Sequence, residues 1–466
     1  MKYRILALTM AFLYLFSSFS VFAAEESSNS SSETTASEAS STTGTDTSTP
    51  DTSAQSEEEQ GILSDSDRGC SIVPDSEDSL ELVGEGIMLM EASTGTVLYS
   101  KNPEEKYYPA SITKVMTTLV ALENSKLTDQ LTYQADTLNA IEQGSSRVGV
   151  EADETMTIED ALYCVMLASG NDAAAGVAEH IGGTIDNFVD MMNAKAKELG
   201  CTNTHFMNPH GLHNEEHYTC AKDMGLIVQA AIQNPDFCKI ASAKSYTVPK
   251  TNKCEARELW NHHKMLLPAS EYHYDGVAEG KTGYTSDAWN TLVTTAEKDG
   301  MKLIAIDLRC QGAAAAYNDT TKLFNYGFEH FTLLKPLSNL SLDSVAEASD
   351  ISIGEVSNLE KLQAVYNKNY TILAPKSVTT DDIAVTLTND GQEQGIWSAI
   401  HFSYDGKEIG KANIYYNEES ELAAIVTEDN STKAKAVSKL PFILTGIIIV
   451  LILFILYLLV SIIRRK

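Results

Sequence analysis

The chain has 466 residues, 43% of them hydrophobic, which is enough for two or three domains and a substantial core. Its 34 basic and 64 acidic residues give a formal net charge of −30, which argues against a nucleic-acid-binding protein, because such proteins carry basic stripes. The seven cysteines include no Cys-x-x-Cys pair, so no zinc or dithiol redox motif is indicated, and their pairing stays open.

The N-terminal residues predict a secretory signal peptide and a spacer. Lys2 and Arg4 precede an apolar run that closes on the small residues Ala23 and Ala24, so residues 1–24 have the anatomy of a signal peptide. An uncleaved N-terminal helix is the alternative. Residues 25–70 are dominated by Ser, Thr, Asp and Glu and cannot bury enough apolar surface to offset their ordering entropy. We expect a disordered linker there.

Residues 71–337 read as a globular α+β domain. The predicted strands span residues 86–90, 96–99, 290–296 and 302–308, the last two joined by an Asp-Gly hairpin turn. The predicted helices span residues 158–168, 172–180, 184–199 and 319–331, within a region that is mostly helical from 110 to about 235. We expect one sheet formed from both ends of this segment, with a helical cluster inserted between.

The C-terminal part predicts a second domain and a membrane anchor. Short strands at 370–373, 383–387 and 412–416, separated by turn residues, predict a small β-rich domain over residues 338–427, followed by a linker at 428–439. Residues 440–463 carry no charge and are long enough to span a bilayer. The basic residues 464–466 should stay cytoplasmic, so we expect a single-pass cell-membrane protein with an extracytoplasmic body.

A short motif stands at the start of a predicted helix. Pro109 precedes a run in which apolar residues recur with the spacing of a core-facing helix. Ser111 and Lys114 lie three residues apart on a polar stripe beside that run. A solvated helix flank would also explain this pair, so the motif alone decides no function.

Two further motifs follow along the chain. Ser169-Gly170-Asn171 ends a predicted buried helix, and Lys281-Thr282-Gly283 stands before the predicted strand hairpin. Each is weak alone, because its glycine also suits an ordinary turn. Together with the Ser-x-x-Lys motif, in this order and on helix, loop and strand, they form the signature of penicillin-binding proteins and class A β-lactamases.

The first motif predicts an activated serine. The Ser111 hydroxyl is a poor nucleophile until a base takes its proton. Lys114, one helical turn away, can be that base only when neutral, and both burial and the nearby charge expected from Lys281 disfavour its charged form. The Ser111 N–H near the helix N-terminus and the Tyr284 N–H are candidates for an oxyanion hole.

The other motif residues predict contacts with the substrate. Ser169 would pass a proton to the leaving amine, and Asn171 would orient the substrate amide. Lys281 and Thr282 suit a terminal carboxylate, as a charge and a hydroxyl donor, within a motif that Gly283 completes.

Residues 82–335 resemble the low-molecular-mass penicillin-binding proteins that are serine-type D-alanyl-D-alanine carboxypeptidases. The blocks that carry the resemblance are residues 109–114, 169–174, 208–212, 221–224 and 280–285. The resemblance implies removal of the terminal D-alanine from peptidoglycan stem pentapeptides through a Ser111 acyl-enzyme. It also implies covalent inhibition by β-lactams, no metal or organic cofactor, and a β-rich C-terminal pedestal that holds the catalytic domain off the membrane.

The chain departs from the family pattern at one place. Members usually carry an arginine just before the last helix of the catalytic domain, which helps to hold the substrate carboxylate. Residues 313–316 are alanines here and residue 317 is tyrosine. Arg309 is either a substitute for that arginine or an ordinary strand-end residue, and the sequence leaves both open.

Three alternatives are weighed against this function. A β-lactamase of the same fold would use a glutamate-activated water, but no Glu-x-x-Leu-Asn pattern follows the second motif and Gly170 replaces its aspartate. His213 and His217 fit the His-x-x-Glu-His pattern of a zinc protease, but that pattern needs a helix and here predicts a loop. A wall-binding scaffold without turnover is the third alternative.

Overall fold

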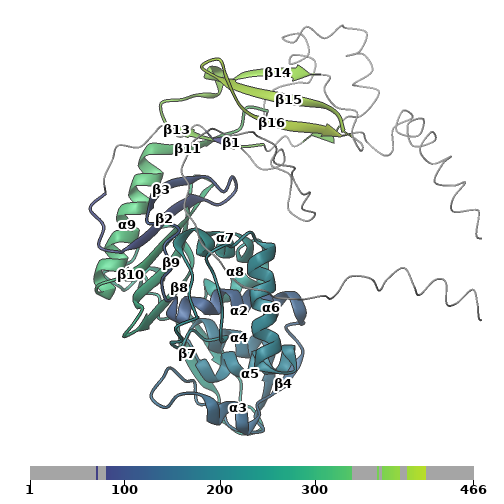
Figure 1. Cartoon of the computed structure of the whole chain (residues 1–466), viewed down its shortest axis with the longest axis vertical. Helices are drawn as coiled ribbons and strands as arrows, with labels where there is room; N and C mark the ends of the chain where they lie inside the picture. Colours follow the sequence, from purple (N-terminus) through teal and green to yellow (C-terminus); the bar gives the residue numbers. More distant parts are fainter. Residues whose placement is uncertain (1–69, 72–79, 338–364, 367–369, 389–395, 416–466) are drawn as a thin grey trace, which may run out of the picture. The chain divides into compact units, whose positions relative to one another are not determined.

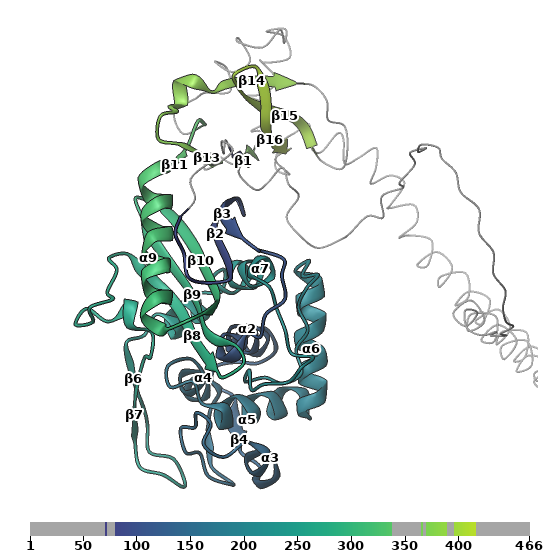
Figure 2. The same cartoon turned by 60° about the vertical axis from the view of Figure 1, so that its left-hand side comes forward.

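The computed structural model describes residues 70–71, 80–337, 365–366, 370–388 and 396–415 (Figures 1 and 2). The chain divides into the units 1–61 and 62–466, and every described residue belongs to the second. The predicted signal peptide, the membrane helix and nearly all of the two predicted linkers lie outside the described residues. Within the described ranges, no helix combines the length and the apolar character that crossing a bilayer requires.

A five-stranded antiparallel sheet forms the centre of the region 80–337, in the order β3-β2-β10-β9-β8. The strands are β2 (Gly86–Glu91), β3 (Val97–Lys101), β8 (Val277–Thr285), β9 (Trp289–Lys298) and β10 (Met301–Cys310). The four predicted strands are confirmed in β2, β3, β9 and β10, and the Asp299-Gly300 turn joins β9 to β10 with positive φ at both residues. The sheet therefore joins the two ends of the segment, as expected.

The two faces of the sheet bury different cores. In β2 and β10, Met88 and Ile304 belong to one apolar cluster, whereas Leu89 and Leu303 belong to the other, because successive strand side chains point to opposite faces. Helix α9 (Ala313–His330) contributes to the second cluster, and the helical cluster lies on the opposite side of the sheet (Figures 1 and 2). This sandwich holds β8 and β9 as a rigid support beside the helices.

The helical cluster consists of short helices. They are η1 (Ala110–Thr113), α2 (Lys114–Asn124), α3 (Ala135–Ala140), α4 (Ile158–Met166), α5 (Asn171–Gly182), α6 (Ile185–Glu198), α7 (Ala221–Ala231) and α8 (Pro235–Ala241). The side chains of Thr157 and Thr184 accept hydrogen bonds from the backbone N–H groups three residues later and so cap α4 and α6. The predicted helices at 158–168, 172–180 and 184–199 are confirmed.

Two small two-stranded sheets and a short helical turn complete this region: β4 (Gln130–Thr132) with β5 (Thr155–Thr157), β6 (Ser245–Val248) with β7 (Arg257–Trp260), and η2 (Lys264–Leu266). The predicted helix 319–331 is present but begins six residues earlier, in α9. The reason is local: alanine is the best helix former, and Gly312, with φ of 110°, ends the preceding segment.

The C-terminal strands occur where the sequence predicts them. A four-stranded sheet has the order β12 (Val365–Tyr366), β16 (Lys407–Tyr415), β15 (Ile396–Tyr404) and β14 (Ala384–Thr388), and η3 (Thr380–Asp382) precedes β14. Strand β13 (Ile372–Pro375) instead pairs with β11 (Phe331–Leu334) and with β1 (Cys70–Ser71). A separate β-rich domain over 338–427 stays a prediction, since part of it is outside the described residues.

Candidate active site

The side chain of Lys114 is buried at the start of α2 among three oxygen acceptors. Its Nζ donates to Ser111 Oγ at 3.0 Å, to Asn171 Oδ1 at 2.7 Å and to the His210 carbonyl oxygen at 2.6 Å. Lys114 itself is 0% exposed. The first two sequence motifs thus meet at the Nζ of Lys114, and the stretch that contains His210 supplies a third partner.

The position of Ser111 is fixed by neighbouring backbone. The 3₁₀ turn η1 places Ser111 one turn before Lys114. A Cβ atom added at Gly283 would lie 2.8 Å from the Ser111 backbone nitrogen, and one added at Gly211 would lie 1.9 Å from the Ala110 carbonyl oxygen. Only glycine at both positions lets strand β8 and the 208–212 stretch approach the turn so closely.

Ser169 and Lys281 form the other half of the site. Lys281 Nζ donates to Ser169 Oγ at 3.1 Å and to the Thr282 carbonyl oxygen at 2.7 Å. Both side chains are buried, and Ser169 has a φ of 57°, a strained conformation for a non-glycine residue just before α5. The second and third motifs therefore meet side chain to side chain.

Burial lowers the pKa of both lysines. The pKa of Lys114 lies well below its usual value, first because its charge is desolvated and second because of the positive charge of Lys281, while Asp172 acts in the opposite direction. Burial lowers the pKa of Lys281 to about 7. A lysine with a strongly lowered pKa can be a proton acceptor near neutral pH.

Strand β8 is the edge of the sheet next to this pair. Thr282 pairs with Leu292 of β9, and Thr291 of the same strand donates its hydroxyl to the Pro109 carbonyl oxygen at 2.7 Å. Thr282 is partly exposed and Tyr284 is 67% exposed. The structure thus brings Ser111, Lys114, Ser169, Asn171 and the Lys281–Gly283 motif together, with Tyr284 at the solvent side of the strand.

A family model described as D-alanyl-D-alanine carboxypeptidase matches residues 74–311, about half of the chain. The chain belongs to this family. It is 30% identical to the D-alanyl-D-alanine carboxypeptidase DacF of Bacillus subtilis over 73% of this chain and 86% of the relative, and 30% identical to DacA of Haemophilus influenzae over 72% and 84%. The crystal structure of the Streptomyces K15 DD-transpeptidase superimposes with a TM-score of 0.51, at 29% identity, over 54% of this chain and 99% of that one.

These similarities establish the reaction class. The protein is a serine hydrolase that acts as a D-alanyl-D-alanine carboxypeptidase, with the mixed helix and sheet fold of penicillin-binding proteins. The resemblance inferred from the motifs is therefore confirmed at the level of family, fold and activity.

The stretch from 208 to 212 contributes a site atom that the motifs did not reveal. Asn208 Oδ1 accepts from the N–H groups of His210 and Gly211, at 3.3 Å and 2.7 Å, and Thr117 donates to the Pro209 carbonyl oxygen at 2.6 Å. These bonds aim the His210 carbonyl at Lys114. The Asn208-Pro209 pair and Gly211 predict a turn here, but they do not predict the direction of the His210 carbonyl.

Asp172 of the carboxypeptidase is a second residue whose role the motifs did not reveal. It is 0% exposed, and its two carboxylate oxygens accept from the backbone N–H groups of Val148, Gly149, Val150 and Ala173. The Asn171 N–H in turn donates to the Ser146 carbonyl oxygen at 2.9 Å. Asp172 therefore holds the 146–150 stretch against the start of α5, next to Asn171.

The structure shows the contacts of Arg309 and Tyr317, which lie where the chain departs from the family pattern. Arg309 forms an ion pair with Glu85 at 3.1 Å, and its guanidinium lies 4.8 Å from the centre of the Trp289 ring. Tyr317 is buried and packs on Tyr272, with ring centres 4.9 Å apart. These contacts favour the strand-end interpretation of Arg309 over a role as substitute for the family's arginine.

The inverted zinc pattern does not form a helical metal site. Residues 213–217 are loop and turn, and both ring nitrogens of His217 have partners: Nδ1 accepts from the Met207 N–H at 3.0 Å, and Nε2 lies 2.8 Å from Thr113 Oγ1. His213 packs edge-on against Tyr108, with ring centres 4.7 Å apart. His217 is therefore a neutral, buried support for the turn that precedes Lys114.

Proposed function

We propose that Ser111 is the acylating nucleophile and that Lys114 is its general base. The observation that carries this proposal is the buried Lys114 Nζ at 3.0 Å from Ser111 Oγ, with a strongly lowered pKa. A nucleophilic serine needs a base within hydrogen-bond reach, and a neutral amine next to it meets that need.

The partners of Lys114 favour a productive orientation of the hydroxyl proton. A protonated amine has three N–H donors for its three acceptors, whereas a neutral amine has two donors and one lone pair. The Asn171 oxygen and the His210 carbonyl can only accept, so both remaining N–H groups go to them. The lone pair then faces Ser111, the one partner whose hydroxyl can donate.

We assign the remaining motif residues to the substrate. Ser169 passes a proton to the leaving D-alanine amine. Lys281 Nζ, which donates to Ser169 Oγ at 3.1 Å, holds the Ser169 hydroxyl in place. Lys281 and Thr282 bind the substrate's terminal carboxylate. The backbone of β8 passes beside the Ser111 N–H, which supports an oxyanion hole shared with the Tyr284 N–H.

The proposed substrate is the D-Ala-D-Ala end of a peptidoglycan stem pentapeptide. Ser111 attacks the penultimate carbonyl, the terminal D-alanine leaves, and water then hydrolyses the acyl-enzyme. A β-lactam carries a reactive amide and a carboxylate in a similar arrangement, so it would acylate the same serine.

The test is a time course of intact mass after adding penicillin to the protein, with Ser111→Ala and Lys114→Ala alongside. We expect a lasting adduct in the parent, none in Ser111→Ala and a strongly slowed reaction in Lys114→Ala. Release of D-alanine from a model pentapeptide separates turnover from a scaffold role. An adduct that disappears within seconds while penicillin is consumed would support a β-lactamase, and a normal rate in Lys114→Ala would refute the base assignment.

We also propose the cellular arrangement that the sequence predicts: a cleaved signal peptide, a 25–70 spacer, an extracytoplasmic catalytic domain on a 338–427 pedestal, and an anchor at 440–463. The apolar, uncharged run followed by three basic residues supports the anchor and its orientation. Deleting residues 440–466 should move the protein from the membrane fraction to the soluble fraction. Unchanged membrane association would refute the anchor.

A further inference from the structure

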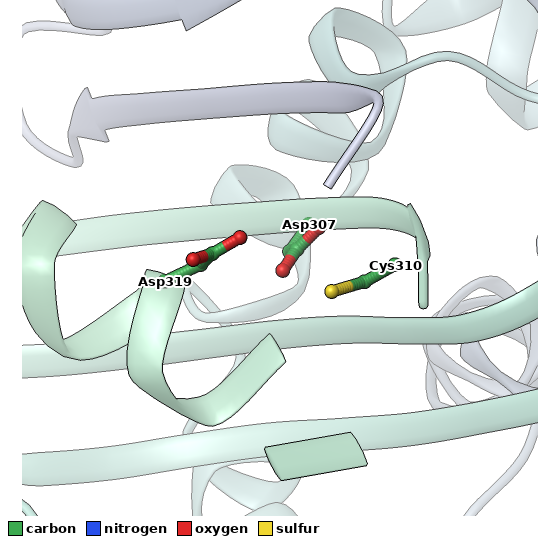
Figure 3. A group of neighbouring side chains, drawn as sticks. All are labelled: Asp307, Cys310 and Asp319. Atoms are coloured by element: carbon green, nitrogen blue, oxygen red, sulfur yellow. The ribbon is translucent and has the colours of Figure 1, made fainter. Parts of the chain in front are cut away.

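Three potential metal ligands meet between strand β10 and helix α9, away from the residues assigned to catalysis. They are Asp307, Cys310 and Asp319, and their ligand atoms all lie within 4.8 Å of one another. All three residues are buried. Figure 3 shows the two carboxyl groups and the thiol pointing toward a common point.

An irregularity in β10 brings Cys310 to the same face as Asp307. Residues three apart on a regular strand point to opposite faces. Between Asp307 and Cys310 the register with β9 shifts, and Arg309 has a φ of 53°. As a result Cys310 packs in the cluster shared with α9, while Leu308 stays in the opposite cluster.

The buried carboxyl group of Asp307 has no hydrogen-bond partner among the described residues. Its side chain lies close against Gly84. Burial and the charge of Asp319 raise its pKa well above the usual value, and Cys310 and Lys101 offset this only in part. Asp319, in contrast, accepts from the Val83 and Gly84 N–H groups at 2.6 Å and 2.9 Å.

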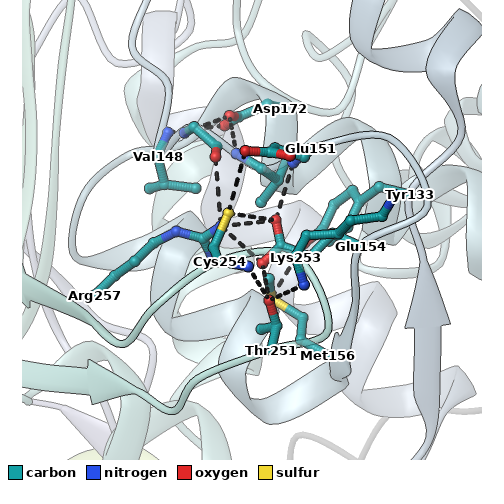
Figure 4. Close-up of polar contacts among 12 residues, drawn as sticks. Tyr133, Val148, Glu151, Glu154, Met156, Asp172, Thr251, Lys253, Cys254 and Arg257 are labelled. Carbon is teal, nitrogen blue, oxygen red and sulfur yellow. Dashed lines mark hydrogen bonds and ion pairs between the residues drawn. The ribbon is translucent and has the colours of Figure 1, made fainter.

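A second cysteine among carboxylates provides a comparison. Cys254 Sγ lies 3.6 Å from Glu151 Oε1 and 3.7 Å from Glu154 Oε2 (Figure 4). There, however, Glu154 already accepts from Arg257 Nη2 at 2.7 Å and from Thr251 Oγ1 at 2.8 Å. Protein groups therefore satisfy the Glu154 carboxylate, whereas the carboxyl group of Asp307 has no such partner among the described residues.

We propose that Asp307, Cys310 and Asp319 bind one divalent transition-metal ion of the Zn²⁺ class. A thiolate with two carboxylates suits a tetrahedral, borderline-soft ion and not Mg²⁺ or Ca²⁺, which prefer oxygen ligands alone. Binding forms one metal–sulfur bond and two metal–oxygen bonds, and the protons of the Cys310 thiol and the Asp307 carboxyl leave to solvent. The fourth position is open to water or a backbone carbonyl.

This ion would link the catalytic sheet to its covering helix. Asp307 pairs with Leu292 of β9, which in turn pairs with Thr282 of β8, so the ion would lie about two strand spacings, roughly 10 Å, from the third motif. Its role is therefore structural: it holds β10, α9 and the 83–84 segment together behind the strands that carry Lys281 and Thr282.

The experiment uses the full-length chain, reduced, treated with a chelator and then incubated with Zn²⁺ or Co²⁺ before desalting. We expect one Zn²⁺ per chain by elemental mass spectrometry, and a thiolate-to-cobalt absorption band with Co²⁺. Cys310→Ser and Asp307→Asn should each weaken Zn²⁺ binding at least about tenfold. The matched control, Cys254→Ser, should bind one Zn²⁺ as the parent does.

Zinc-edge X-ray absorption on the parent protein tests the same site without any variant, so it does not depend on whether the variants fold. One Zn–S distance of about 2.3 Å with oxygen ligands otherwise supports it. A parent that binds no metal would mean that the two carboxyls share a proton instead, and would overturn it. Loss of zinc in Cys254→Ser, or full retention in folded Cys310→Ser and Asp307→Asn, would also overturn it.

Discussion

Gly283 leaves no room for a side chain between strand β8 and the serine turn. A Cβ there would meet Thr291 Oγ1 at 2.3 Å and the Ser111 nitrogen at 2.8 Å. We expect Gly283→Ala to lower the rate constant for penicillin acylation at least roughly tenfold, about 1.4 kcal/mol of transition-state stabilisation, because β8 must move away from the nucleophile. Acylation kinetics by intact mass, with circular dichroism to verify folding, provide the check, and an unchanged rate in a folded variant would contradict it.

The lowered pKa of Lys281 predicts that the rate of acylation depends on pH. Burial lowers that pKa to about 7, so the positive charge proposed to hold a carboxylate is present below this pH and is lost above it. The second-order rate constant for acylation by a carboxylate-bearing β-lactam should therefore fall as pH rises from about 7 to 9. Lys281→Arg stays charged, so its profile should lack this decline. A decline of equal size in Lys281→Arg would assign the ionisation to another group.

For single residues, the sequence predicts which side chains belong to the site better than it predicts which backbone atoms do. Ser111, Lys114, Ser169, Asn171 and Lys281 are found together because each reactive group lies in a recognisable short motif. The His210 carbonyl is not marked by any residue type, since every residue carries a carbonyl. Its direction depends on the hydrogen bonds that the backbone N–H groups of His210 and Gly211 donate to the Asn208 side chain, which a single sequence does not reveal.

The 208–212 stretch acts as an element that positions the base. Asn208→Ala removes the acceptor of the His210 and Gly211 N–H groups, so the His210 carbonyl should no longer be oriented toward Lys114 Nζ. We expect acylation to slow roughly tenfold, in line with the cost of about 1–3 kcal/mol for an unsatisfied buried group. Asn214→Ala, in the exposed loop just after this stretch, also removes an acceptor of a backbone N–H and is the control. Equal rates in the two variants would argue against a positioning role.

Elements were predicted where a local pattern dominates. Strands β2, β9 and β10 alternate or run apolar between turns, and α4 and α6 begin at capping threonines. The predicted start of α9 at residue 319 is wrong, because the alanines at 313–316 extend the helix toward its N-terminus. The sequence does not predict the bulge between Asp307 and Cys310, since only the pairing with β9 reveals a change of face.

For the whole molecule, buried histidines predict loss of stability in acid. Burial lowers the pKa of His217 to about 3 and that of His263 to about 4, so both stay neutral in the folded state. The unfolded chain binds protons at these residues below about pH 6.5, so the free energy of unfolding should fall as pH drops from 6.5 toward 4. Urea unfolding at several pH values measures this. His217→Gln should show a shallower fall than the parent.

His180, at the exposed end of α5, provides the control for this experiment. His180→Gln should keep the parent's dependence of unfolding free energy on pH. If His217→Gln and His180→Gln gave the same slope, groups other than the buried histidines would be responsible for the acid sensitivity.

The contact of β8 and β9 with the serine turn has a consequence for folding. Gly283 and Thr291 touch residues 109–111, and β2 pairs with β10, so segments about 170 to 220 residues apart must meet before the site exists. Contacts this distant in sequence are closed late, after local helices have formed. During synthesis, a chain that ends before residue 291 cannot have a complete nucleophile environment. A fluorescent penicillin would then label only chains that have finished folding, and its labelling rate would report on the folding of the site.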